Sequence, residues 1–278
     1  MSLYFAYGSN LNLEDLTAWA ARAGFDPPDF RFVGAAWLPD HRLAFHYYSQ
    51  ARKGGALDVV PCLGSAVPGA LFETEQWDLL DAKEGAGRSY ERIEHPVLMK
   101  GEVRAATTYR VRAVRRQEEL VPPTPAYSSA VEAGLARWGL DAAPLCEAAN
   151  GRVHRLRSVF VYGTLMRGHS RAPFMERHRP IGVAPAIVPG TLLDLGPYPG
   201  LLLEGATTVH GEVWSYSSDL GDLLGELDEV EDFEGWDALA RSLYRRVVVE
   251  VPTPAWTYVY QGPRGPVIPD GRWLLARE

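Results

Sequence analysis

The sequence has little cysteine and no long apolar run. Cys62 and Cys146 are the only cysteines among 278 residues, too few for a disulfide framework or a cysteine-rich zinc site and typical of a reducing compartment. No apolar run approaches the roughly 20 residues that span a bilayer. The first residues also lack the basic segment and apolar core of a signal peptide. We therefore expect a soluble, cytoplasmic protein with no membrane partner.

Basic charge is also scarce. The chain has 28 Lys and Arg against 35 Asp and Glu, a net charge of −7. A general nucleic-acid binder needs a positive stripe to meet phosphates, so we expect no nucleic-acid partner. The remaining composition, 46% hydrophobic and 23% charged, is that of an ordinary globular protein. The length predicts two domains or one large domain.

Motifs for metal binding and for nucleophilic catalysis are missing. Seven histidines occur, but none forms His-x-x-x-His or His-Glu-x-x-His, so we expect no metal site. His41 and His46, five positions apart on an expected strand, would face opposite sides and are interpreted as ordinary surface or half-buried residues. Cys62 has no adjacent base, and no Gly-x-Ser-x-Gly elbow appears.

The chain contains two copies of one ordered pattern. A short apolar run leads into Tyr-Gly-Ser at residues 7–9 and into Tyr-Gly-Thr at residues 162–164. Each copy continues with a Gly-containing apolar segment, a Leu-Asp-x-x-Glu motif and a further tyrosine. From the first tyrosine to the glutamate is 77 positions in one copy and 69 in the other. Four elements in the same order indicate a tandem duplication.

The duplication predicts two domains, residues 1–150 and 151–278. The boundary is expected between Asp141 and Arg157, where Asn150-Gly151 is a turn dipeptide. Strands are expected at 3–7, 35–47, 90–97, 105–114, 159–162, 245–251 and 256–260. Helices are expected at 13–23 with Asn12 as cap, at 74–80, at 127–138, and at 218–231 with Ser217, Ser218 and Asp219 as caps. Strands dominate without strict βαβ alternation, which favours an α+β fold.

The Tyr-Gly-[Ser/Thr] turns have the features of an anion site. Glycine permits a sharp turn and close approach of a ligand. Successive backbone N–H groups exposed there would suit a carboxylate or a developing oxyanion. The side chains of Ser9, Asn10 and Thr164 would add hydrogen bonds.

The glutamates of the two Leu-Asp-x-x-Glu motifs are candidate proton acceptors. Leucine and glutamate are four positions apart and share a helical face, so Glu84 and Glu231 would point inward if the leucines do. Burial of a carboxylate is costly and raises its pKa towards the range useful for a general base. The alternative is that each glutamate pairs with a nearby arginine, namely Arg88 or Arg92 in the first copy and Arg245 or Arg246 in the second.

These motifs resemble a known family. The segments 7–11, 80–85 and Tyr90 resemble the γ-glutamylcyclotransferase family. The segments 159–165, 198–200, 211–214, 227–231 and 244–246 are similar to its γ-glutamylaminecyclotransferase (AIG2-like) branch. The resemblance implies a small mixed β-barrel flanked by helices in each half, with no metal or cofactor. It also implies release of 5-oxoproline from a γ-glutamyl amine or γ-glutamyl peptide.

The resemblance further assigns roles to residues. Glu84 and Glu231 would be the general acid/base residues, and the loops Tyr7–Leu11 and Tyr162–Leu165 would hold the substrate's α-carboxylate through backbone N–H groups. The expected substrate-binding residues are Tyr7, Gly8, Ser9, Asn10, Leu11, Tyr90, Tyr127, Tyr162, Gly163, Thr164, Leu165 and Tyr244.

Three departures from the family pattern leave alternatives open. Tyr127 lies one position off a Pro-Ser-x-x-Tyr stretch, so it is either a substrate contact or a plain aromatic at a helix start. Asp232 follows Glu231 where glycine is expected, so Glu234, which precedes Gly235, is the alternative second glutamate. Asn10 aligns with Leu165, so the two pockets are expected to differ in polarity. A duplicated binding module for a small acidic ligand, without chemistry, remains the alternative function.

Overall fold

The computed structural model describes residues 2–274, and the chain divides into two compact units. The first ends at Arg155, and the second begins at Leu156 and also includes Lys100–Glu102. Both units mix strands and short helices, which confirms the α+β fold class. The domain limits 1–150 and 151–278 remain a prediction. No helix of the described residues is long and apolar enough to cross a membrane.

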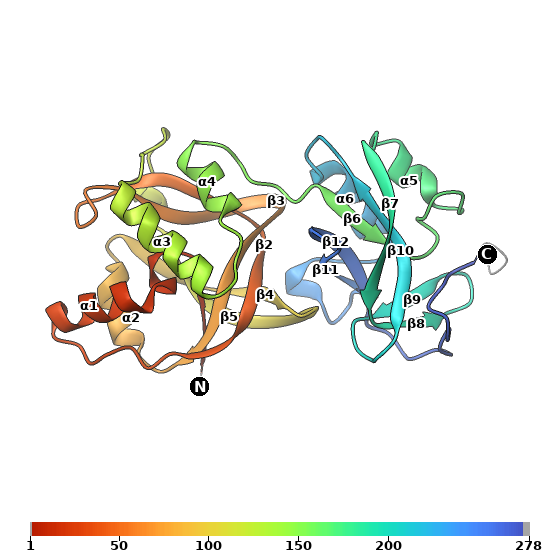
Figure 1. The fold of residues 1–278 in the computed structure, drawn as a ribbon, viewed down its shortest axis with the longest axis horizontal. Helices are drawn as coiled ribbons and strands as arrows, with labels where there is room; N and C mark the ends of the chain where they lie inside the picture. The colour runs from red at the N-terminus through yellow and green to blue at the C-terminus, as the bar shows by residue number, and fades with distance from the viewer. Residues whose placement is uncertain (1, 275–278) are drawn as a thin grey trace. The chain divides into compact units, whose positions relative to one another are not determined.

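The first unit is a closed barrel of five strands in the order β1-β3-β2-β4-β5. Figure 1 labels β2, β3, β4 and β5 in this unit. Its strands are β1 (Ser2–Ala6), β2 (Arg31–Ser49), β3 (Gly54–Thr74), β4 (Tyr90–Met99) and β5 (Glu102–Val111). The long strands β2 and β3 form an antiparallel hairpin, and β1 also pairs with β3 in antiparallel orientation. A parallel contact between Tyr4 and Thr107 joins β1 to β5.

The helices of the first unit begin and end largely where local chemistry predicts. They are η1 (Ser9–Leu11), α1 (Leu13–Ala23), α2 (Trp77–Glu84), η2 (Ala113–Arg115), α3 (Pro125–Arg137) and α4 (Ala143–Ala149). The Asn12 side chain accepts the N–H groups of Glu14 and Asp15, both at 3.1 Å, which confirms Asn12 as the cap of α1.

The helix predicted at 74–80 needs correction. It lies later, because Thr74 ends β3 and its Oγ1 accepts the Gln76 N–H at 3.0 Å. The helix therefore begins at Trp77 and ends at Glu84, before the left-handed Gly85. A further helix, α4, begins at Ala143, with Pro144 in its first turn.

The second unit repeats the strand order of the first in an open form. Its sheet runs β11-β12-β6-β10-β7, with a separate ribbon of β8 and β9. Its strands are β6 (Ser158–Val161), β7 (Gly182–Pro189), β8 (Thr191–Asp194), β9 (Pro199–Leu202), β10 (Thr208–Ser215), β11 (Tyr244–Glu250) and β12 (Pro254–Tyr260). A parallel contact of Trp256 with Val159 joins β12 to β6, as β5 joins β1. The repeated order agrees with a tandem duplication.

The two units differ in closure and in helices. In the first unit β2 pairs with β4 and closes the barrel. The corresponding strands β7 and β11 are the two edges of the second sheet. The helices of the second unit are α5 (Ala172–Glu176), α6 (Gly221–Val230) and η3 (Trp236–Ala238). α6 is shorter than the predicted 218–231, and its N-cap residue is Leu220 rather than one of the three predicted caps. Asp219, the residue before it, accepts the Gly221 N–H at 2.8 Å.

The two histidines of β2 occupy different environments. His41 is buried and its Nδ1 lies 2.8 Å from the carbonyl oxygen of Pro39, so its interpretation as a surface or half-buried residue is wrong. His46 is half-buried, and its Nε2 lies 2.5 Å from the carboxylate of the fully buried Asp58. That carboxylate also accepts the N–H groups of Val59 and Val111, which satisfies it inside the barrel.

Candidate active sites

Each unit carries its motif glutamate at the end of a helix. Glu84 is the last residue of α2, and Glu231 directly follows α6. Leu80 and Leu227, four positions earlier, are fully buried. Because residues four apart share a helical face, each buried leucine turns its glutamate towards the interior.

The Tyr-Gly loops form matching turns beside these glutamates. The N–H of Leu11 donates to the carbonyl of Gly8 at 3.0 Å, and the N–H of Met166 donates to that of Gly163 at 2.9 Å. These bonds leave the N–H groups at the start of each turn directed outward, as at the start of any helix. In the first turn these belong to Ser9 and Asn10. Leu11 needs correction, because its N–H is used within the turn and its side chain is fully buried.

Gly163 is required by packing. A Cβ at this position would lie 2.5 Å from Cγ of Pro199, well inside van der Waals contact. The glycine therefore lets β9 approach the Tyr-Gly loop closely.

Glu84 is held by polar neighbours in the first unit. Asn10 Nδ2 donates to Glu84 Oε1 at 2.8 Å and lies 2.9 Å from the Tyr4 hydroxyl oxygen. Burial raises the pKa of the Glu84 carboxyl. The positive charge of Lys83, the Asn10 hydrogen bond and the positive charge of Arg52 act in the opposite direction.

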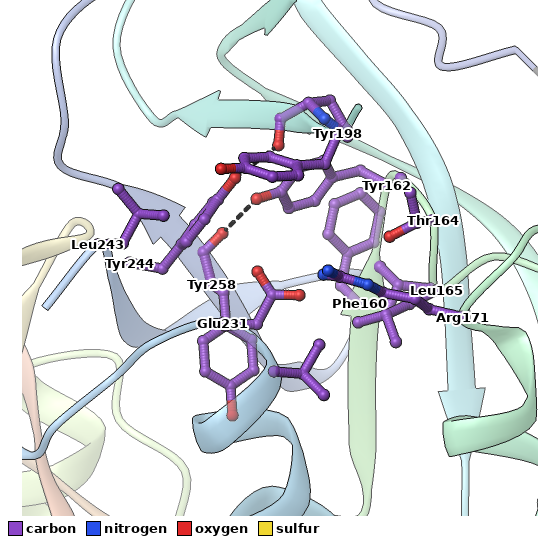
Figure 2. Close-up of a pocket in the computed structure, with 14 residues that line it drawn as sticks. Phe160, Tyr162, Thr164, Leu165, Arg171, Tyr198, Glu231, Leu243, Tyr244 and Tyr258 are labelled. Carbon is purple, nitrogen blue, oxygen red and sulfur yellow. Dashed lines mark hydrogen bonds between the residues drawn. The ribbon is translucent and has the colours of Figure 1, made fainter. Parts of the chain in front are cut away.

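Glu231 lies in a less polar pocket in the second unit. A cavity of about 180 Å³ is lined by the Tyr-Gly-Thr loop, Glu231, Arg171 and a set of aromatic and aliphatic side chains. Figure 2 shows the Glu231 carboxylate between Tyr244 and Arg171. Burial raises the pKa of Glu231 to about 7, and the positive charge of Arg171 opposes this shift. Leu165, which aligns with Asn10, also lines the cavity, so the predicted difference in polarity is present.

The arginine alternative fails in both units, because the arginines pair with the motif aspartates. Arg92 Nε donates to Asp81 Oδ1 at 2.6 Å, and Arg246 Nη1 donates to Asp228 Oδ2 at 2.9 Å. Of the other two named arginines, Arg245 reaches Gln261 Oε1 at 3.4 Å, and among the described residues Arg88 forms no ion pair with Glu84. The aspartate three positions before each glutamate thus takes the arginine and leaves the glutamate facing its pocket.

Four predicted tyrosines make matched hydrogen bonds to backbone carbonyls. Tyr7 donates to Tyr109 at 2.6 Å, as Tyr162 donates to Tyr258 at 2.8 Å. Tyr90 donates to Leu57, as Tyr244 donates to Pro199, both at 2.8 Å. Burial raises the pKa of all four hydroxyls, so they stay protonated. Tyr7 and Tyr162 thus tie each Tyr-Gly loop to a neighbouring strand. Tyr90 and Tyr244 tie their own strands, β4 and β11, to β3 and β9.

The open questions on Tyr127 and Glu234 have structural answers. Tyr127 is buried in α3, and its hydroxyl accepts the Leu57 N–H at 3.2 Å and faces the same cavity as Glu84. Glu234 is exposed and pairs with Arg241 at 2.7 Å, outside the pocket that Glu231 lines. Glu231 is therefore the glutamate at the second pocket.

Several residues at the sites carry no recognisable signal in the sequence. In the first unit these are Tyr4, Arg52, Lys83 and Tyr109. In the second they are Arg171 and Tyr258. Tyr198 belongs to the Tyr-Pro-Gly motif that leads into β9, but its contact with a pocket depends on how the β8–β9 ribbon folds back. The hydroxyl of Tyr258 donates to Asp228 at 2.6 Å, just as Tyr109 donates to Asp81 at 2.7 Å.

The first pocket has two parts. An inner cavity of about 30 Å³ is bounded by Tyr4, the Tyr-Gly loop, Glu84 and Tyr127. Glu84, Ser9 and Tyr127 also border an outer groove of about 340 Å³. Among the residues that the structure describes, no group of three or more His, Cys, Asp or Glu is arranged to hold a metal ion.

Comparison with known proteins relates both units to one family. The family model "Gamma-glutamyl cyclotransferase, AIG2-like" matches residues 4–128 and again residues 159–275. A protein of Vibrio cholerae named "Putative gamma-glutamylcyclotransferase" is 38% identical over 104 residues, which are 37% of this chain and 81% of that protein. The "Gamma-L-glutamyl-butirosin B gamma-glutamyl cyclotransferase" of Niallia circulans is 34% identical over 116 residues, 40% of this chain and 70% of that protein.

Solved structures include a similar protein described as "Gamma-glutamyl cyclotransferase". It is 26% identical, the match covers 55% of this chain and 88% of that protein's chain, and the TM-score is 0.43. The family assignment rests on the double match of the family model, which covers most of the chain. The chain therefore belongs to the AIG2-like γ-glutamylcyclotransferase family, and it contains that family's domain twice.

Proposed function

We propose that the chain is a γ-glutamylcyclotransferase that releases 5-oxoproline and an amine from a γ-glutamyl amine or γ-glutamyl peptide. One observation carries the proposal: each unit has a half-buried glutamate with a raised pKa that faces a Tyr-Gly turn, while Arg92 and Arg246 pair with the motif aspartates instead. The name of the Niallia relative supports a γ-glutamyl compound as the substrate, because γ-L-glutamyl-butirosin B is named there.

The reaction requires a base and an oxyanion site but no external nucleophile. The substrate's α-ammonium loses a proton to the glutamate, and the free amine attacks its own γ-carbonyl carbon. The new C–N bond closes the five-membered ring, and the carbonyl oxygen becomes an oxyanion. As the carbonyl reforms, the glutamate returns its proton to the leaving nitrogen and the bond to that nitrogen breaks. The ring nitrogen then gives its second proton to the glutamate, which passes it to the released amine, so the products are the neutral lactam 5-oxoproline and an ammonium. No water is consumed.

The residues of each site would divide this work. The first N–H groups of each turn would bind the α-carboxylate or the oxyanion, and one oxyanion donor is worth about 3 kcal/mol. Glu84 or Glu231 would transfer the proton, a contribution of roughly 10²–10⁴-fold. Because the nucleophile is tethered to the electrophile, well-oriented closure reaches effective molarities of about 10⁵–10⁸ M. The protein's main task is then to hold the glutamyl arm in a bent conformation.

A binding module without catalysis would gain nothing from a carboxylate turned into its pocket. An inward negative charge repels an acidic ligand and costs desolvation energy. The two glutamates are therefore better explained as proton carriers than as parts of a carboxylate receptor.

The test is 5-oxoproline release across a panel of γ-glutamyl amino acids, peptides and amines. We expect Glu84→Gln to abolish release at the first site and Glu231→Gln to abolish it at the second. Substrate binding should persist in both, because glutamine keeps the shape of the side chain. Glu234→Gln is the matched control, since Glu234 is exposed and paired with Arg241 outside the pocket, and it should leave the rate unchanged. Binding of the panel compounds without any 5-oxoproline would support the binding-module alternative.

A further inference from the structure

The outer groove of the first site is lined by basic side chains. Arg22, Arg52, Lys83 and Arg88 all border it, and Glu84 is the only acidic residue among those that line it. This concentration of positive charge is unusual for a chain with a net charge of −7. It indicates a local preference for anions.

The charges of these side chains are only partly compensated. Arg52 Nη2 lies 2.6 Å and Lys83 Nζ 3.6 Å from the same Asp15 oxygen, so one carboxylate serves two cations. Among the described residues, Arg22 and Arg88 form no ion pair with Asp or Glu, and both are exposed. The groove therefore keeps a net positive charge, and two guanidinium groups are available to a ligand.

The basic side chains lie at the reacting end of the site. The Arg88 guanidinium is 3.3 Å from the position a Cβ would take on Gly85, the residue next to Glu84. The Arg52 guanidinium lies over the ring of Tyr127, 5.3 Å from its centroid, and Tyr127 borders both the inner cavity and the groove. If the glutamyl part lies at the Tyr-Gly turn, the amine that it releases must extend into this groove.

The cavity of the second site has a different lining among the described residues. It is lined by Tyr198, Pro199, Val230 and Leu243, and its one basic lining residue is Arg171, which faces Glu231. An anionic group on the released amine would meet aromatic and aliphatic surface there, and its desolvation would be uncompensated.

We propose that the first site acts on γ-glutamyl compounds whose released amine carries an anionic group, which Arg22 and Arg88 bind, whereas the second site does not select for such a group. This inference rests on the proposed function. The two sites of the chain would then accept substrates that differ in the charge of the released amine, so they would not be redundant.

The experiment compares γ-glutamyl-alanine with γ-glutamyl-alaninamide in the full chain. Glu231→Gln leaves the first site as the source of 5-oxoproline, and Glu84→Gln leaves the second. With the first site alone, kcat/KM is expected to favour γ-glutamyl-alanine. Arg22→Gln and Arg88→Gln should each reduce kcat/KM for that substrate about fivefold, the effect of about 1 kcal/mol from one exposed ion pair. Neither substitution should change kcat/KM for the amide.

The controls separate the possible failures. Arg137→Gln, which removes an exposed arginine of α3 outside the groove, should leave both substrates unaffected. Equal use of the two substrates by the first site, or an equal loss for both in the arginine variants, overturns the inference and leaves the proposed function intact. If the unsubstituted chain produces no 5-oxoproline from any panel compound, the proposed function fails and the inference fails with it.

Discussion

The amide of Asn10 should set the pKa of Glu84, and the second unit offers a natural comparison. Asn10 Nδ2 donates to Glu84 Oε1 at 2.8 Å, whereas the aligned residue of the second unit, Leu165, has no polar group. A hydrogen bond to a charged group is worth about 1.5–3 kcal/mol. One pKa unit corresponds to about 1.4 kcal/mol. Asn10→Leu should therefore raise the pKa of Glu84 by about one to two units.

The sign follows from the form of glutamate that the hydrogen bond stabilises. The amide N–H stabilises the carboxylate, so its loss favours the protonated acid. The assay is the pH dependence of kcat/KM for 5-oxoproline release, whose acid limb reports the base of the free enzyme. In a Glu231→Gln background, the Asn10→Leu variant should move this limb to higher pH by about one to two units.

The reverse substitution tests the same reasoning in the second site. In a Glu84→Gln background, Leu165→Asn should move the acid limb of Glu231 from about pH 7 to lower values. An acid limb that stays in place in both variants, with turnover retained, would refute the assignment of these glutamates as the titrating bases. A shift in the opposite direction would refute the electrostatic argument.

Two further predictions concern stability. Asp228→Asn should lower the free energy of unfolding by about 3 kcal/mol in urea titrations, because it removes a carboxylate partner of the buried Arg246. Asp81→Asn should lower it by no more than about 1 kcal/mol, because Arg92 is partly exposed. Equal losses in the two variants would contradict this reasoning. Glu231 has a folded-state pKa of about 7, above its ordinary value, so the native state binds the extra proton and stability falls as pH rises from about 4.5 to 7. Glu231→Gln should remove this decline, so it should raise the melting temperature at pH 8 but not at pH 4. The same pH dependence of stability in the variant and in the unsubstituted chain would refute the raised pKa of Glu231.

Local signals predicted much of the fold. The helix at 13–23 and its Asn12 cap follow from an Asx side chain placed before an amphipathic segment. The turn after each Tyr-Gly pair follows from glycine at the end of an apolar strand. The ordered repetition of short motifs revealed the duplication, which the common strand order of the two units reproduces.

The missed strands lack the usual signal. β3 is buried along nearly its whole length, so it shows no alternation of polar and apolar residues, and it contains several glycines and prolines. β7 and β10 are interrupted by Pro185 and Gly211, which weaken a strand prediction. A Cβ at Gly211 would lie 2.2 Å from the carbonyl oxygen of Val161, so this glycine serves the strand pairing.

The composition of the sites is only partly accessible from the sequence. The glutamates and the Tyr-Gly loops can be found because each lies in a short motif with a fixed register. The partners that tune them are distant in sequence: Asn10 is 74 positions from Glu84. Arg171 is the residue before a five-residue helix that no periodicity predicts. Such contacts depend on the tertiary fold, so the sequence alone does not predict them.

The central claim is that a glutamate of the protein transfers the proton while the substrate closes to a lactam. The double variant Glu84→Gln/Glu231→Gln tests it most directly. The assay measures 5-oxoproline and the released amine together by mass spectrometry, from one γ-glutamyl substrate that the unsubstituted chain converts. We expect the two products in equal amounts from the unsubstituted chain and a rate at least about 100-fold lower from the double variant, which should still bind the substrate. Full activity of the double variant would contradict the account.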